Sequence, residues 1–206
     1  MHRRRSRALT VGAVALGTAL QPFGTAPSAN FGSTACGGTP RNCVSVANNS
    51  VHAVRFASLG EVPYIADATQ WALTYQYNPT DLLAYRDDLD PYPDVVASDS
   101  NFGNNGLVAW VECPTDNTGE SGTDPYRSCR GQRLRYNSWF WLYDTAYDTQ
   151  AGRRKIACHE LGHTLGLRHW DQYHTGTGSC MYNPPVDATV EGLNTHDRDH
   201  INGYYS

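Results

Sequence analysis

The chain has few positively charged residues. Its 206 residues include 16 Lys and Arg against 20 Asp and Glu, which gives a formal net charge of −4 at pH 7. Beyond the first seven residues, the basic residues form no stripe that could follow a phosphate backbone, and an acidic surface repels phosphates. We therefore expect no nucleic-acid partner.

The chain also lacks an apolar run long enough to cross a membrane. The uncharged run from Ala8 to Leu20 falls short of the roughly 20 apolar residues that a transmembrane helix needs. It follows the basic segment Met1 to Arg7 and precedes a stretch rich in small residues and proline, Gly24 to Ala29. Because this is the layout of a secretory signal peptide, we predict one at residues 1–29, with cleavage at its end or after Ala26, and no membrane partner.

A chain of this length has no room for a second large domain. Removal of residues 1–29 takes away four arginines and no acidic residue, so 12 of the 16 basic residues remain beside 20 acidic ones and the net charge becomes −8. These properties are typical of a soluble extracellular protein. We expect residues 30–206 to form one domain, secreted and monomeric.

No C-x-x-C pair, the spacing of a zinc cluster, occurs among the six cysteines. In an exported chain an even number of cysteines indicates disulfide bonds. Six cysteines allow fifteen connectivities. Position in the sequence favours the pairs Cys36–Cys43, Cys113–Cys129 and Cys158–Cys180.

The chain does contain a metal-binding pattern. The eleven residues from His159 to His169 read HELGHTLGLRH and fit H-E-x-x-H-x-x-G-x-x-H at every fixed position. On a helix, His159 and His163 lie four residues apart on one face, so both imidazoles can reach one zinc ion. Gly166 can adopt the left-handed conformation that ends a helix, which allows His169 to return as the third ligand. Three protein ligands leave the fourth position open, as in catalytic zinc sites.

Glu160 lies beside the face that carries the two helical histidines. Its carboxylate is close to the metal's water but poorly aimed to replace an imidazole, which suits a general base. A bare H-E-x-x-H also occurs on helices that bind no metal, but here Gly166, His169 and a downstream Ser179-Cys180-Met181-Tyr182 extend the pattern. We predict one catalytic Zn²⁺ held by the three histidines, with Glu160 as the catalytic residue.

The extended pattern, with its methionine-containing turn at Ser179 to Tyr182, resembles the metzincin clan of zinc endopeptidases, in particular small secreted members of the matrixin and snapalysin kind. The likeness is strong from about Val95 to the C-terminus. It implies an α/β (α+β) metzincin zincin fold, with a twisted mixed sheet and the active-site helix over a small lower subdomain after Gly166. It also implies that the strand at Gly106 to Glu112 is the sheet edge above the zinc cleft, where an extended substrate can pair.

The resemblance implies a secreted zinc-dependent endopeptidase that acts on a protein or peptide. The alternative is a non-catalytic, zinc-stabilised extracellular binding domain, which would have no use for Glu160. Met181 is expected to pack beneath the imidazoles without binding the metal. Tyr182 directly follows Met181, whereas tyrosine-liganded metzincins place their tyrosine two residues after the methionine, so a fifth-ligand role is not assigned to it. For His174 we prefer a surface loop residue over a fourth metal ligand. Pro184 to Val186 resembles a wall of the substrate pocket.

Periodicity and turn residues predict the other elements. The acid-dense segment Asp87 to Asp90 admits a structural Ca²⁺, but no twelve-residue ligand loop is present and a solvated turn is preferred. For the aromatic residues between Trp139 and Tyr143, we prefer a packing role in the core over contact with a substrate. We expect strands at Val44–Val46, Val51–Phe56, Asp94–Ser98, Gly106–Glu112 and Gln132–Asn137, and helices at Glu61–Tyr77, Thr149–Leu165 and Asn194–Tyr205.

Overall fold

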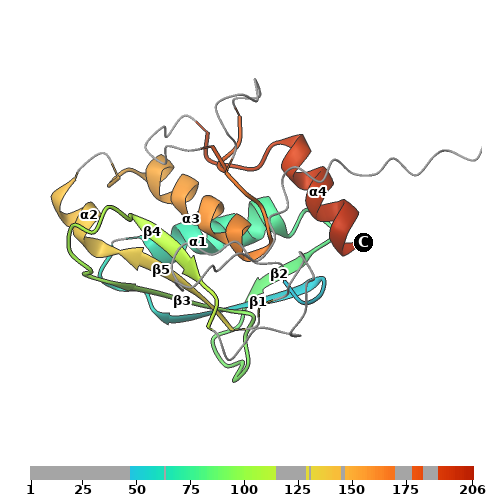
Figure 1. The fold of residues 1–206 in the computed structure, drawn as a ribbon, viewed down its shortest axis with the longest axis horizontal. Coiled ribbons are helices and arrows are strands. Elements are labelled where there is room, and N and C mark those ends of the chain that lie inside the picture. Colours follow the sequence, from blue (N-terminus) through green and yellow to red (C-terminus); the bar gives the residue numbers. More distant parts are fainter. Residues whose placement is uncertain are drawn as a thin grey trace, which may run out of the picture.

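The fold is a five-stranded mixed sheet with helices packed against it, as shown by a computed structural model (Figure 1). This confirms the predicted α/β (α+β) class. The structure describes residues 47–62, 64–114, 129, 131–144, 147–169, 178–182 and 190–206. The predictions that lie outside these residues are the signal peptide at 1–29, the strand at 44–46, the Cys36–Cys43 pair, His174 and the wall at 184–186.

The sheet has the strand order β2-β1-β3-β5-β4. Neighbouring strands are parallel except that β4 runs antiparallel to β5. The β4 strand therefore lies at the edge of the sheet, where it was expected, and β2, which the sequence did not predict, forms the other edge. The strands are β1 (Val51–Ser58), β2 (Leu83–Arg86), β3 (Val95–Ser100), β4 (Ala109–Glu112) and β5 (Gln132–Asn137).

Two of the three predicted helices keep their bounds to within a residue. Thr149 caps the active-site helix, since its hydroxyl accepts a hydrogen bond from the Gly152 N–H at 3.0 Å. The last helix begins with a capping box in which Asn194 is the N-cap and Asp197 is its partner. The helices are α1 (Ile65–Ala72), the π-helix η1 (Leu73–Tyr77), α2 (Ser138–Tyr143), α3 (Gln150–Thr164) and α4 (Thr195–Tyr205).

The helix predicted from Glu61 begins four residues later. The Asp99 carboxylate accepts hydrogen bonds from the Val62 N–H at 2.7 Å and from the Gly60 N–H at 3.2 Å, which holds this segment outside the helix. Tyr64 then adopts a left-handed φ of 59° immediately before α1. The helix was predicted from a stripe of apolar residues that includes Tyr64 and Tyr75, and both of these are exposed. The change from α- to π-helix at Leu73 alters the angular spacing on which that stripe was predicted.

Helix α3 is buried on every side over its second half. Ala157, Cys158 and Leu161 enter the core, and His159 and His163 are buried as well. The helix lies between the sheet, α1 and the chain that follows Gly166, so no side of its C-terminal half faces solvent.

The part of the chain after Gly166 is joined to the sheet layer by a tyrosine of the last helix. The Tyr205 hydroxyl donates to the Leu165 carbonyl at 3.0 Å and accepts from the Ala47 N–H at 2.9 Å. These bonds link the C-terminal helix to the end of α3 and to the chain just before β1. Within the described ranges, no helix has the length and apolar character required to span a membrane.

Candidate metal centre

Three imidazoles converge at the C-terminal end of α3. The Nε2 atom of His163 lies 3.0 Å from Nε2 of His159 and 3.0 Å from Nε2 of His169. Zinc–nitrogen bonds of about 2.0–2.1 Å in a tetrahedral site place two nitrogens about 3.3 Å apart, so the three Nε2 atoms are spaced as ligands of one ion. The three histidines that were predicted as ligands could therefore hold a metal ion.

Gly166 directs the chain so that the third histidine reaches the other two. Helix α3 ends at Thr164, and Gly166 has a φ of 98°, a backbone conformation that residues with a Cβ rarely adopt. Three residues later the exposed His169 meets the two buried histidines of the helix. The left-handed turn predicted at Gly166 is confirmed.

The outer nitrogens of the two helical histidines contact backbone carbonyls. His159 Nδ1 lies 2.8 Å from the Cys180 oxygen, and His163 Nδ1 lies 2.7 Å from the Leu167 oxygen. Because a carbonyl oxygen can only accept, each Nδ1 carries the hydrogen and each Nε2 lone pair points to the shared centre. Burial also lowers the pKa of His163 to about 3, with a smaller contribution from His169, so its ring is neutral near pH 7, as a ligand must be.

Glu160 is buried beside the histidines. Burial raises the pKa of its carboxyl to about 8, because the low-dielectric surroundings disfavour the charged form. Its Oε2 atom is buried and has no hydrogen-bond partner among the described residues. A buried acid with an unsatisfied oxygen beside three convergent imidazoles fits a site that places water and a cation next to this carboxylate.

The methionine-containing turn packs directly against α3. A Cβ on Gly162 would lie 2.4 Å from Met181 Sδ and 3.1 Å from the Tyr77 hydroxyl, so only glycine allows this approach. The Cys158–Cys180 disulfide joins the same two segments, as predicted, and the Cys113–Cys129 disulfide is also present. The fully buried Met181 thus lies against α3 at Gly162, between His159 and His163.

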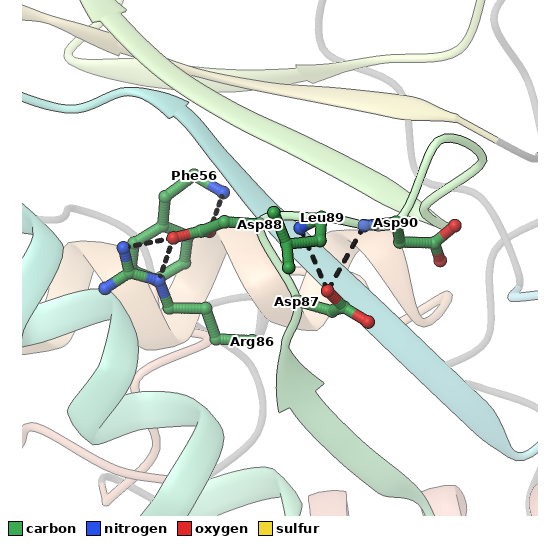
Figure 2. Close-up of polar contacts among 6 residues, drawn as sticks. All are labelled: Phe56, Arg86, Asp87, Asp88, Leu89 and Asp90. Carbon is green, nitrogen blue, oxygen red and sulfur yellow. Dashed lines mark hydrogen bonds and ion pairs between the residues drawn. The ribbon is translucent and has the colours of Figure 1, made fainter.

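The acidic segment after β2 is a turn in which the carboxylates bond within the chain. Asp87 accepts hydrogen bonds from the N–H groups of Leu89 and Asp90 at 3.0 and 3.2 Å (Figure 2). Asp88 accepts from the Phe56 N–H and from the Arg86 guanidinium, and the Arg86 contact lowers the pKa of the Asp88 carboxyl. These contacts fit the turn that was preferred over a calcium site.

The aromatic segment forms the unpredicted helix α2 and has two kinds of environment. Trp141 is buried and makes an edge contact with Tyr136 at 6.3 Å between ring centroids, which is the expected packing role. Tyr143 is exposed and lies beside Trp139. Asn137, whose side chain accepts from the Trp139 N–H at 3.2 Å, is the cap signal in the sequence that would have identified this helix.

Comparisons with known proteins add little to this site. No family model matches the chain, and no curated protein matches it either. Among solved structures the fold is similar to that of myroilysin, with a TM-score of 0.48 and 13% sequence identity over 78% of this chain and 95% of that chain. At these values, the case for a metal centre depends on the residues themselves.

Several groups that support the centre were not predicted. The carbonyls of Cys180 and Leu167 orient the imidazoles, and the Tyr77 hydroxyl donates to the carbonyl of Cys158, the residue directly before His159. Backbone carbonyls leave no residue-specific signal in a sequence. Tyr77 was predicted only as the last residue of a helix, because its partner is 81 residues away.

Proposed function

We propose that the chain is a secreted zinc endopeptidase, with a metzincin-like catalytic domain at residues 30–206 and Glu160 as its general base. The observation that carries the proposal is the convergence of the three Nε2 atoms next to a buried, unpaired carboxylate. A zinc ion held by His159, His163 and His169 would polarise the scissile carbonyl and lower the pKa of water to about 7.

The chain's own groups have distinct roles in this reaction. The two helical histidines are held by the Cys180 and Leu167 carbonyls, so that their Nε2 lone pairs stay aimed at the ion. Glu160 accepts the proton of the attacking water at its unpaired oxygen and later gives it to the leaving amine. A cation held by the three imidazoles would favour the charged carboxylate and would so oppose the burial that raises its pKa.

A peptide substrate is supported by the edge position of β4. Among the described strands β4 pairs only with β5, and it packs against α3, the helix that carries His159 and His163. The outward N–H and C=O groups of an edge strand can pair with an extended chain. This arrangement favours a peptide over a compact small molecule.

Export to an oxidising compartment is supported by the two disulfides. Both Cys113–Cys129 and Cys158–Cys180 are bonded, and the described residues contain no free cysteine. Such bonds persist in extracellular and periplasmic proteins and are rare in the cytosol. The predicted signal peptide at 1–29 would supply the export route.

Substitution of Glu160 separates the peptidase from a zinc-stabilised binding domain. We expect Glu160→Ala to keep one zinc per chain, since the carboxylate is not a ligand, while peptide cleavage falls by about 10² to 10⁴-fold. His169→Ala should lose zinc affinity and cleavage together. The measurement is metal content per chain beside the cleavage rate of a diverse quenched-peptide library. Zinc-loaded wild type that cleaves no faster than Glu160→Ala would favour the binding domain.

A further inference from the structure

A second site candidate lies on the sheet face opposite the metal centre. Side chains alternate between the two faces of a strand. His52 of β1 and Gln132 of β5 both reach Thr164 of α3, at 2.9 and 2.8 Å, so they mark the helix-covered face. Arg55 and Arg133, at odd spacing from these residues along the same strands, therefore point to the other face.

Strand register brings these two arginines into one row. Arg55 of β1 is paired with Val96 of β3, and Val96 is paired with Arg133 of β5. Because strands lie about 4.8 Å apart, the two arginine Cα atoms are about 10 Å apart across a small apolar side chain. Arg135 lies two residues further along β5 on the same face. The sheet thus presents guanidinium groups on both sides of Val96.

These residues line a cavity of about 670 Å³ that the segment around Tyr92 borders. The charged side chains of its lining are Arg55, Arg133, Arg135 and one acid, Asp94. The chain as a whole carries −4, so this excess of positive charge is a local feature of the cavity. A cavity with excess guanidinium groups favours an anionic ligand.

The three arginines differ in the hydrogen bonds and ion pairs that their guanidinium groups already make within the protein. Arg135 contacts the Ser98 hydroxyl at 2.6 Å and the Glu112 carboxylate at 3.7 Å, and Arg55 donates to the Asp90 carbonyl at 3.2 Å. Arg133 is paired in register with Glu112, yet it has no hydrogen bond or ion pair with any described residue. Its guanidinium remains available for an external carboxylate.

We propose that this cavity binds an acidic peptide segment, with carboxylates on Arg133 and Arg55. Acidic residues at positions i and i+2 of an extended chain lie about 6.7 Å apart on one side, within reach of two arginines whose Cα atoms are about 10 Å apart. A bare phosphate or sulfate would fill only a small part of 670 Å³ and would make no use of the exposed Tyr92 ring at the rim. A peptide can occupy both the charged floor and the aromatic rim.

A binding experiment tests the site independently of the proposed peptidase activity. A fluorescent peptide containing Asp-Ala-Asp and its Asn-Ala-Asn counterpart are titrated with full-length protein carrying Glu160→Ala, so that neither peptide can be consumed. We expect the acidic peptide to bind and its affinity to fall as salt rises. Arg133→Gln and Arg55→Gln should each weaken binding about tenfold or more, as expected for loss of a charge-assisted hydrogen bond.

Arg86→Gln is the matched control, because Arg86 is an exposed arginine of the neighbouring strand β2 that lies outside the cavity lining. It removes the same charge and should change affinity by less than about twofold, a change typical of surface positions. Circular dichroism and the melting temperature check that each variant is folded, and Arg133→Lys, which keeps the charge, should recover part of the affinity.

Three results would overturn the proposal. The first is equal affinity for the Asn-Ala-Asn peptide. The second is an affinity of the Arg133→Gln and Arg55→Gln variants for the acidic peptide that equals the wild-type affinity. The third is displacement of the peptide by inorganic phosphate or by a heparin fragment at equal or lower concentration, which would identify a free anion or a polyanionic saccharide as the preferred ligand.

Discussion

Gly162 is a position of close contact between α3 and the methionine-containing turn. In a helix interior, Gly→Ala normally stabilises by about 1 kcal/mol, because alanine loses less backbone entropy. Here the new Cβ would lie 2.4 Å from Met181 Sδ in a fully buried position, and overpacking of this kind costs about 1–3 kcal/mol. The steric term should exceed the propensity term.

We therefore predict that Gly162→Ala lowers the free energy of unfolding, as measured by urea denaturation. Gly60→Ala is the control, since a Cβ there would have no atom within 4 Å. In a Met181→Ala background only the 3.1 Å approach to the Tyr77 hydroxyl remains, so the same Gly162→Ala change should cost less. An equal loss in both backgrounds would contradict a contact between Gly162 and Met181.

At the scale of elements, the two disulfides differ in what they join. Cys158–Cys180 closes a separation of 22 residues and ties α3 to the turn, whereas Cys113–Cys129 closes 16 residues between β4 and β5. The chain-entropy model assigns about 3 kcal/mol to each, so loss of stability cannot tell them apart. Only the Cys180 segment also supplies the carbonyl that holds His159.

We predict that replacing Cys158 and Cys180 by serine weakens zinc binding as well as folding, whereas replacing Cys113 and Cys129 lowers stability alone. Loss of an outer-shell partner typically costs about 10- to 100-fold in metal affinity. Zinc affinity is measured by competition with a chelator at a temperature where both variants remain folded. Equal zinc affinities for the two variants would show that the first disulfide does not position His159.

At the scale of the whole molecule, burial keeps the His52 imidazole in its neutral form. Burial lowers the pKa of His52 from 6.5 to about 3, and its Nε2 atom contacts the Thr164 hydroxyl. Below pH 6.5 the unfolded chain takes up a proton that the folded chain does not, so acid favours unfolding. This contribution to stability is fully present above pH 6.5 and is lost as the pH falls toward 3.

We predict that the free energy of unfolding falls by up to about 1.4 kcal/mol per pH unit through this one group between pH 6.5 and 4. His52→Gln has no titrating ring and an amide that can still reach Thr164, so its stability should depend less steeply on pH. Both proteins are compared at the same zinc concentration, so that the contribution of the three ligands cancels. Parallel stability curves for the two proteins would rule out His52 as the source.

Local rules were enough to predict much of the chain. The spacing of His159 and His163, the left-handed turn at Gly166 and the start of a helix near Thr149 depend on residues within a few positions of each other. The period of a helix and the steric freedom of glycine decide such features before any tertiary contact forms. The bounds of α3 and the edge position of β4 were predicted for this reason and by resemblance.

Tertiary structure alone decided what surrounds these elements. The start of α1 depends on the Asp99 carboxylate, the orientation of the imidazoles on the Cys180 and Leu167 carbonyls, and the arginine cavity on the register of three strands. Contacts such as His159 to Cys180 span many residues and often use backbone atoms that every residue shares. Side-chain type and local period do not encode them, because their geometry exists only once the sheet and helices have packed.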